Sequence, residues 1–187
     1  MTHEINVPYH VEKTEYPYSE GWFRIQRDTL VNDNGGRFPY PFAHIKPVAA
    51  VVGIDAENNI ILQHEYRPTY RKTVTELSCG GLDPNEKEEA GAAREFREET
   101  GYEIEHLEKM GTWHTLTGKC VVDLHMFFGR VKGPIDGPRH LDEFELIEPF
   151  KVKAREAVEM IMRGEIVNAE HIALIFFVKE KYPHFFK

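Results

Sequence analysis

The sequence has few cysteines and no long hydrophobic run. Its two cysteines, Cys79 and Cys120, are far apart and have no C-x-x-C spacing, which argues against a zinc site or a disulfide framework and favours a reducing compartment. The longest apolar run, Ile172 to Val178, is far shorter than the roughly 20 residues that a membrane helix needs. The N-terminus also lacks the basic and then apolar pattern of a signal peptide. We therefore expect a cytoplasmic protein with no membrane partner.

Basic residues are also in short supply. The chain has 23 Lys and Arg against 31 Asp and Glu, a net charge of −8. Any polyanion meets a repulsive field at this surface, so stable nucleic-acid binding is not expected. With 187 residues, of which 41% are hydrophobic and 29% are charged, the chain has the composition of one globular domain with a small appendage and not that of a disordered chain.

The amino-acid composition and hydrophobic pattern along the chain predict two parts. Residues 1–45 contain many aromatic and proline residues around the turn Asn32–Gly36, which indicates an N-terminal antiparallel β appendage. Residues 46–187 have strand patterns interspersed with a few helix patterns, which predicts an α/β sandwich as the main domain. The strands are expected at 48–54, 60–65, 73–77, 107–115, 120–131 and 144–152, and the helices at 86–100, 154–163 and 169–181.

An acidic patch marks the first predicted helix. At about 100° per residue, Glu95, Glu98 and Glu99 fall on one face of it. Like charges at these spacings cost a few tenths of a kcal/mol per pair, yet the same patch suits a hard divalent cation such as Mg²⁺, which prefers oxygen ligands. An acidic helical run is also often just a solvated face. The patch alone leaves both interpretations open.

The spacing of residues around the acidic patch favours the metal site over a solvated face. The pattern is G-x5-E-x7-R-E-U-x-E-E-x-G-U, where U is a bulky apolar residue, and a chance match in a chain of this length has odds on the order of 10⁻⁷ or less. It is satisfied by Gly80, Glu86, Arg94, Glu95, Phe96, Glu98, Glu99, Gly101 and Tyr102. The segment resembles the signature of the Nudix hydrolase family. That resemblance implies an α/β/α sandwich with a mixed sheet, and Mg²⁺ as the cofactor, with Mn²⁺ able to substitute.

The resemblance also implies a role for each residue of the motif. Metal binding would fall to Glu95, Glu98 and Glu99, helped by the backbone carbonyl of Cys79 and not by its thiol, and Glu99 would also be catalytic. The structural positions of the motif would be Gly80, Glu86, Arg94 and Gly101. The residue types suit these roles, because glycine permits a tight turn at position 80 and the Arg94 guanidinium can pair with Glu86 to hold the loop.

The residues upstream of the signature indicate which subgroup of the Nudix hydrolase family the chain resembles. The runs His64–Pro68 and Thr75–Gly80 resemble the pattern of ADP-ribose and nucleotide-sugar pyrophosphatases, in which Arg67 would clamp the diphosphate and Glu76 would organise the substrate side. Ser78 and Cys79 stand where Pro and Ala are usual. ADP-ribose members commonly carry a proline some fifteen residues past the signature, and Trp113–Gly118 has none, which argues against a strict ADP-ribose preference.

Two further segments supply candidate residues. The acidic stretch Asp142–Glu148 resembles the loop from which nucleotide-sugar members supply a catalytic glutamate, with Glu143 as our first choice of general base and Glu145 as the second; a plain surface charge run is the alternative. By analogy with the same members, the N-terminal appendage would pair two subunits and help to hold the nucleobase of the substrate. Its candidate aromatic residues for stacking on the base or for the dimer interface are Trp22, Phe23, Phe38 and Tyr40.

The resemblance as a whole implies a homodimeric enzyme. The expected reaction is Mg²⁺-dependent hydrolysis of the diphosphate bond in a nucleoside diphosphate sugar of the ADP-ribose, ADP-glucose or GDP-mannose type, giving a nucleoside monophosphate and a sugar phosphate. One alternative is removal of diphosphate from a 5′ RNA end, which the net negative charge disfavours. Another is a noncatalytic nucleotide-sensing module of the same fold.

Overall fold

The computed structural model describes residues 6–187 and divides them into two compact units. One contains the described residues up to Lys46 together with His114–Asp123, and the other contains Pro47–Trp113 and Leu124–Lys187. The sequence suggested one boundary near residue 45. The segment His114–Asp123 instead joins the N-terminal unit, because Ala43 and Ile45 donate backbone hydrogen bonds to the carbonyls of Lys119 and Val121 at 2.9 and 3.1 Å.

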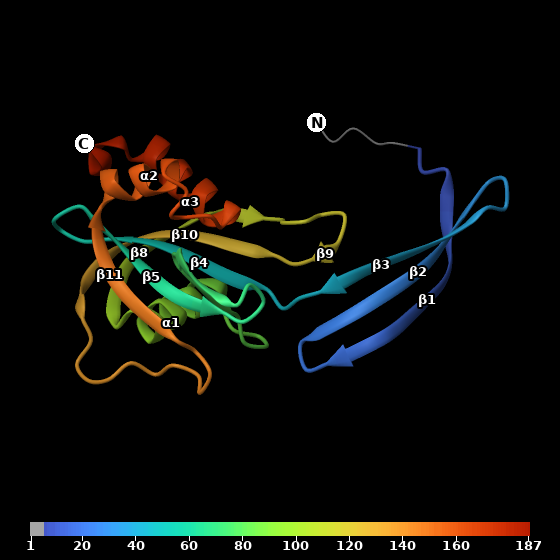
Figure 1. Cartoon of the computed structure of the whole chain (residues 1–187), viewed down its shortest axis with the longest axis horizontal. Helices are drawn as coiled ribbons and strands as arrows, with labels where there is room; N and C mark the ends of the chain where they lie inside the picture. The colour runs from blue at the N-terminus through green and yellow to red at the C-terminus, as the bar shows by residue number, and fades with distance from the viewer. Residues whose placement is uncertain (1–5) are drawn as a thin grey trace. The chain divides into compact units, whose positions relative to one another are not determined.

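The N-terminal unit is a small β-sheet. Strands β1 (Tyr9–Glu20), β2 (Phe23–Asn32) and β3 (Arg37–His44) pair antiparallel in that order, and the short β9 (Cys120–Val121) adds to β3 in parallel (Figure 1). The predicted turn joins β2 to β3. Its geometry comes from the Asn32 side chain, whose Oδ1 accepts hydrogen bonds from the backbone of Asn34 and Gly36 at 3.1 and 2.8 Å, and from Gly35 at a φ of 78°.

The second unit contains a mixed sheet. Its strands run in the order β11-β5-β4-β10-β8, with β6 paired to β5 and β7 paired to β4. The pair β4/β10 is parallel and the other pairs are antiparallel. The strands are β4 (Val48–Ile54), β5 (Asn59–Arg67), β6 (Lys72–Glu76), β7 (Ser78–Gly81), β8 (Tyr102–Trp113), β10 (Leu124–Pro134) and β11 (Ile147–Lys153).

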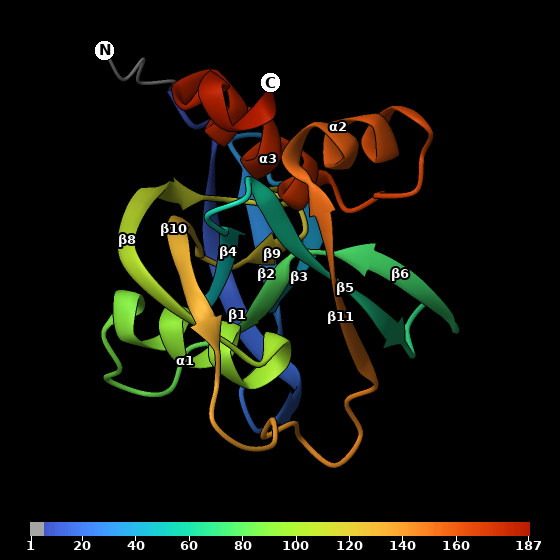
Figure 2. The same ribbon diagram turned by 90° about the vertical axis from the view of Figure 1, so that its left-hand side faces the viewer.

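Helices cover both faces of this sheet. Helix α1 (Glu88–Thr100) lies on one face, and α2 (Ala154–Met162) and α3 (Ala169–Lys181) lie on the other, followed by a short 3-10 helix (Pro183–Phe186) (Figure 2). The predicted α/β/α sandwich with a mixed sheet is therefore confirmed. In the part of the chain that the structure describes, no helix combines the length and apolar character needed to cross a membrane.

The packing of α1 against the sheet depends on Phe96. This side chain is fully buried in a core with residues such as Val51, Ile61 and Phe127, a burial that contributes roughly 1.5–3 kcal/mol. It lies so close to β4 that a Cβ on Gly53 would come within 2.5 Å of its ring. The contact fixes the height of α1 above the sheet, and so the position of the acidic residues on its other side.

Several element boundaries differ from the expected ones. The predicted strand 120–131 is broken, because Cys120–Val121 pair with β3 whereas Leu124–Arg130 pair with β4. The helix expected from residue 86 begins at Glu88, because a turn precedes it in which the Glu86 N–H donates to the Asp83 carbonyl at 3.0 Å. Strand β8 begins earlier than predicted, β11 begins later, and the short β7 was not predicted.

Candidate active site

The site starts at the junction between β7 and α1. Gly80 has no side chain to keep α1 away, and Glu95 occupies that space: a Cβ on Gly80 would lie 2.0 Å from Glu95 Oε2. Glycine is needed here for close approach and not for a positive φ. Strand β7 therefore runs directly against the carboxylate that the signature supplies.

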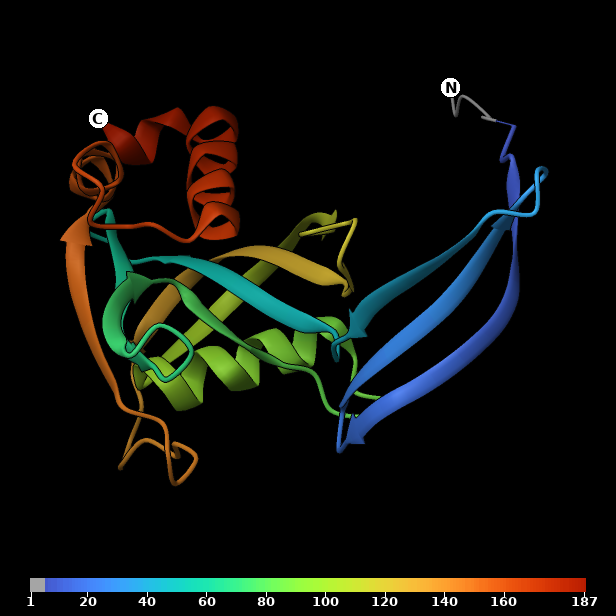
Figure 3. The same cartoon turned by 45° about the vertical axis from the view of Figure 1, so that its right-hand side comes forward.

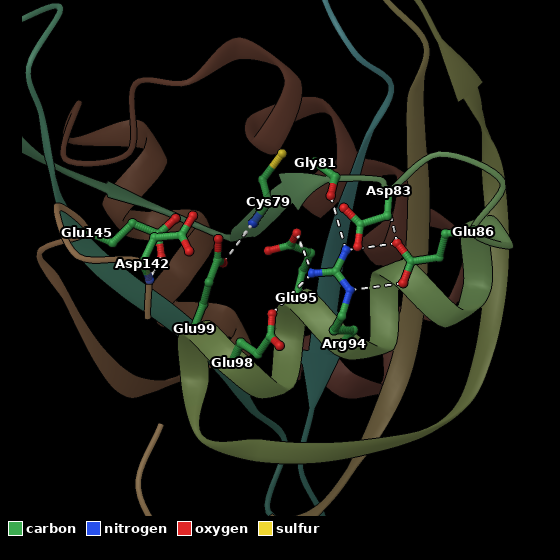
Figure 4. Close-up of polar contacts among 10 residues, drawn as sticks. All are labelled: Cys79, Gly81, Asp83, Glu86, Arg94, Glu95, Glu98, Glu99, Asp142 and Glu145. Atoms are coloured by element: carbon green, nitrogen blue, oxygen red, sulfur yellow. Dashed lines mark hydrogen bonds and ion pairs between the residues drawn. The ribbon is translucent and has the colours of Figure 1, made fainter. Parts of the chain in front are cut away.

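Arg94 holds the acidic side chains of the motif together (Figure 4). Its Nε and Nη2 donate to the two oxygens of Glu86 at 2.9 and 2.8 Å, and Nη1 donates to Glu95 at 2.8 Å and to Glu98 at 3.1 Å. Nη2 also donates to the Gly81 carbonyl at 3.1 Å. The guanidinium thereby links the loop before α1 to the helix and reduces the repulsion between carboxylates. The structural roles expected for Arg94 and Glu86 stay predictions.

Glu99 is the buried member of the acidic set. It is 3% exposed, and its Oε2 accepts hydrogen bonds from the Cys79 N–H and from Gln63 Nε2, each at 3.1 Å. Burial, together with the charge of Glu95, raises the pKa of Glu99 to about 7 in spite of these hydrogen bonds. Burial also raises the pKa of the Cys79 thiol, which keeps that thiol protonated. The backbone N–H of Cys79 therefore contacts the site through Glu99. The metal-binding role of the Cys79 carbonyl stays a prediction.

A second polar layer lies beside Glu99, on β5 and β6. Gln63, Glu65 and Arg67 alternate along β5, so they share one face of the strand. The Arg67 guanidinium is 2.6 Å from Glu65 Oε1 and also pairs with Glu76, the last residue of β6. Burial, together with Glu76, raises the pKa of Glu65. Arg67 and Glu76 thus meet, and their predicted substrate roles stay predictions.

Gln63 and Glu65 were not predicted to belong to the site. Gln63 is fully buried, and its Nε2 donates both to Glu65 at 3.3 Å and to Glu99 at 3.1 Å. Its Oε1 is buried without a hydrogen-bond partner in the structure. The alternation of polar residues in an otherwise apolar strand was the available signal. Only the fold shows which carboxylates this face meets.

A buried histidine fixes the bend at the end of β6. His171, near the start of α3, accepts a hydrogen bond at Nδ1 from the Leu77 N–H at 3.2 Å. Burial lowers the pKa of His171 to about 4, so the ring is neutral near pH 7 and is able to accept that bond. Leu77 separates β6 from β7, and this contact therefore supports the chain between Glu76 and Gly80.

The other predicted residues are distributed over both units. Glu145 is half-buried in the loop between β10 and β11, where it closes a turn with Asp142 through two hydrogen bonds of 3.0 Å. Burial raises the pKa of Glu95, and the charges of Glu98 and Glu145 add to this effect. Glu143 is exposed in the same loop. Trp22 and Phe23 contact each other edge to face in the N-terminal unit, with ring centroids 6.1 Å apart.

The donor set fits a hard divalent cation, although the carboxylates are not gathered around one point. In residues 6–187, no three His, Cys, Asp or Glu side chains are close enough together to form a metal group. The reason is local: Arg94 engages Glu95 and Glu98, while Glu99 turns to Gln63 and Cys79. Three carboxylates on one helix face, with a buried amide oxygen that lacks a donor, nevertheless offer the oxygen chemistry that Mg²⁺ prefers.

Comparison with known proteins identifies the class that this fold and site define. The model of the NUDIX domain matches residues 44–173, more than half of the chain, and the chain therefore belongs to the Nudix family, as predicted. Divalent metals are typically needed by the hydrolases of this family.

Among its relatives, the chain is 26% identical over 163 residues to a methanol dehydrogenase activator of Bacillus methanolicus (87% of this chain, 88% of that protein). It is 30% identical over 121 residues to an ADP-ribose pyrophosphatase of Bacillus subtilis (65% of each chain). It is 26% identical over 172 residues to a GDP-mannose pyrophosphatase of Yersinia enterocolitica (84% of this chain, 88% of that protein). A crystal structure of an ADP compounds hydrolase, 18% identical, superposes with a TM-score of 0.80 over 97% of this chain and 98% of that one, which confirms the fold.

The buried charge of Glu99 leads to a prediction about stability. Between its ordinary pKa of 4.5 and its raised pKa of about 7, native Glu99 holds a proton that the unfolded chain releases, so stability falls as the pH rises through this window. Glu99→Gln keeps an oxygen acceptor and removes the charge. We expect this variant of the metal-free protein to gain about 1–3 kcal/mol at pH 8 and to lose that gain near pH 5, as measured by urea unfolding in EDTA.

Glu98→Gln is the matched control. Glu98 is one residue earlier on α1, its side chain is more exposed, and it also contacts Arg94. Its replacement should change stability by less than about 1 kcal/mol at either pH. If Glu99→Gln were less stable than the native protein at pH 8, the hydrogen bonds to the ionised carboxylate would outweigh its burial, and a raised pKa would be wrong.

Proposed function

We propose that the chain hydrolyses the diphosphate bond of nucleoside diphosphate sugars of the ADP-ribose, ADP-glucose or GDP-mannose type, yielding a nucleoside monophosphate and a sugar phosphate. The observation that carries this proposal is the helix α1, which presents Glu95, Glu98 and Glu99 beside β7 with Arg94 fixing the loop. The names of two relatives support the substrate class, because they are an ADP-ribose and a GDP-mannose pyrophosphatase.

In this proposal, Glu95, Glu98, Glu99 and the carbonyl of Cys79 hold Mg²⁺, for which Mn²⁺ is able to substitute. When bound by these residues, a divalent cation would supply positive charge to the diphosphate and would lower the pKa of a bound water. Arg94 keeps its two bonds to Glu86 and so maintains the loop whatever Glu95 and Glu98 bind. Arg67 contacts the diphosphate with the accessible part of its guanidinium, since 34% of its side chain is exposed while Glu65 and Glu76 orient it.

We assign the general base to Glu145. Sequence reasoning ranked Glu143 first, but the charge of Glu145 acts on Glu95, and its side chain is half-buried and ordered by the turn with Asp142. Glu143 is exposed. A base must reach the proton that it accepts, and the electrostatic link to Glu95 favours Glu145 for that task.

We also propose that the chain forms a homodimer through its N-terminal unit. Aromatic residues of this unit would help to hold the nucleobase of the substrate. Apolar side chains are unusually exposed on its sheet, with Trp22 at 59% and Phe38 at 60%. Phe23 and Tyr40 are more covered, and Tyr40 is fixed by a hydrogen bond of 3.0 Å to the Gly118 carbonyl. The cytoplasmic location we propose accords with a chain that has only two cysteines, and cell fractionation tests it.

A substrate panel tests the reaction. With Mg²⁺ or Mn²⁺, we expect at least one of ADP-ribose, ADP-glucose, GDP-mannose and the UDP-sugars to give a nucleoside monophosphate and a sugar phosphate, as identified by phosphorus NMR. EDTA and Glu99→Gln should each abolish turnover, because EDTA removes the divalent cation and the substitution replaces one proposed carboxylate ligand by a neutral amide. Release of diphosphate from 5′-triphosphorylated RNA, with no nucleotide sugar cleaved, would favour the RNA-directed alternative. Nucleotide binding without any turnover would favour the sensing module.

Paired substitutions test the general base. Glu145→Gln should lower kcat by about 10²-fold or more and remove the acid limb of the pH–rate profile, because the amide cannot accept the proton. The matched control is Glu143→Gln, two residues earlier in the same loop, which should stay within a few-fold of the native kcat. The reverse order of effects would restore Glu143 as the base.

Sedimentation tests the dimer. Replacing both Trp22, in the turn between β1 and β2, and Phe38, in β3, by Glu puts charges at two exposed apolar positions of the N-terminal unit, so we expect a dimer of the native chain to become a monomer with weakened substrate binding. Met162→Glu is the control, since Met162 is 77% exposed on α2 in the other unit. A native chain that is monomeric and fully active at micromolar concentration would contradict the proposal.

A further inference from the structure

The loop between β10 and β11 is anchored at both ends and exposed between them (Figure 3). At its start, the Ile135 N–H donates to the Gly101 carbonyl at 2.9 Å, and at its end the Tyr66 N–H donates to the Leu146 carbonyl at 3.1 Å. Between these bonds, Phe144 is 86% exposed. The loop carries Glu145, and its course therefore decides where that carboxylate lies.

Arg139 lies in this loop and forms hydrogen bonds with the end of α1 and the start of β11. Its Nη1 donates to the carbonyl of Glu99 at 2.7 Å, and its Nη2 donates to the carbonyl of Ile147, the first residue of β11, at 2.9 Å. The last carbonyls of a helix have no partner within the helix, and they form the negative end of its dipole. A guanidinium suits this place because its planar fork satisfies two carbonyls at once.

Gly101 makes room for this arginine. It adopts a φ of 74°, and a Cβ at this position would lie 3.1 Å from Arg139 Cγ and 3.2 Å from Cδ. The arginine stem thus crosses directly over the residue that ends α1. Glycine at this position of the signature therefore serves two purposes, because it ends the helix in the left-handed conformation and lets Arg139 reach the Glu99 carbonyl.

We propose that Arg139 is a positioning residue that ties the 140–145 segment to the end of α1 and so places Glu145 for proton transfer. It acts through the backbone of Glu99 and Ile147 and needs no contact with substrate. One side chain thereby sets the distance between the proposed base and the acidic helix. This inference rests on the proposed function and adds a residue that lies outside the signature.

A double-mutant cycle in the full chain tests the proposal. Arg139→Ala should lower kcat about 10- to 100-fold with KM changed by less than about threefold, because a displaced base slows the proton transfer more than binding. Combined with Glu145→Gln, it should cause little further loss, since the group through which it acts is already disabled. Arg139→Lys should recover part of the kcat by restoring one hydrogen bond. Independent, multiplying effects of the two substitutions would overturn the inference.

A readout independent of activity separates failure of this inference from failure of the proposed function. Chymotrypsin cleavage after the exposed Phe144 should be at least about threefold faster in Arg139→Ala than in the native chain, because the loop is released from α1. The matched control is Arg97→Gln, which removes an exposed ion pair with Glu103 in the last turn of the same helix and should change neither kcat nor cleavage. Unchanged cleavage in Arg139→Ala would overturn the anchoring role even if no substrate were found. Faster cleavage with an unchanged kcat would overturn the placement of Glu145.

Discussion

The structure of the site depends on the ion pairs and hydrogen bonds of Arg94. Without the Arg94 guanidinium, the carboxylates of the signature would repel each other across one helix face, and the loop before α1 would lose the hydrogen bonds that this side chain gives to Glu86 and Gly81. The Arg94 guanidinium donates to Glu86, Glu95, Glu98 and the Gly81 carbonyl. It therefore joins the loop, the helix and the end of β7 in one contact, and substitution by lysine would lose the planar fork that makes this possible.

A more deeply buried layer of carboxylates lies beside the half-buried Arg94 network. Glu65 and Glu99 both have a raised pKa because they are buried, and Gln63 bridges them with an amide whose oxygen lacks a partner. Burial of two carboxylates disfavours their ionised forms and so costs stability where they ionise. A structure optimised for stability alone would not retain this arrangement. We interpret it as the stability that the chain gives up for a site with oxygen ligands in a medium of low dielectric constant.

The sequence predicted the parts of the site that are local in the chain. Glu95, Glu98 and Glu99 share a helix face because helical spacing dictates it, and Gly80 and Arg94 stand at fixed distances from them within one segment. The identity of the neighbours of Glu99 is not local. Gln63 meets Glu99 because β5 lies in the same sheet as β7, a pairing that no spacing within the signature encodes. The break in the strand after Val121 was not predicted for the same reason. The residues before the break pair with β3 in one sheet, and those after it pair with β4 in the other sheet.

The balance of charge at the site supports the proposed binding of a divalent cation. Glu65, Glu76, Glu86, Glu95, Glu98 and Glu99 surround two guanidiniums, and both of these are already engaged: Arg67 by Glu65 and Glu76, and Arg94 by the carboxylates of the signature. A diphosphate entering here would add negative charge to an acidic cluster in a protein whose net charge is −8. Protonation of Glu65 and Glu99 relieves part of the excess in the metal-free state, whereas a divalent cation would displace those protons and reverse the sign of the local field. In the proposed function, the acidity of the cluster, which alone would repel the substrate, thus becomes the means of binding it.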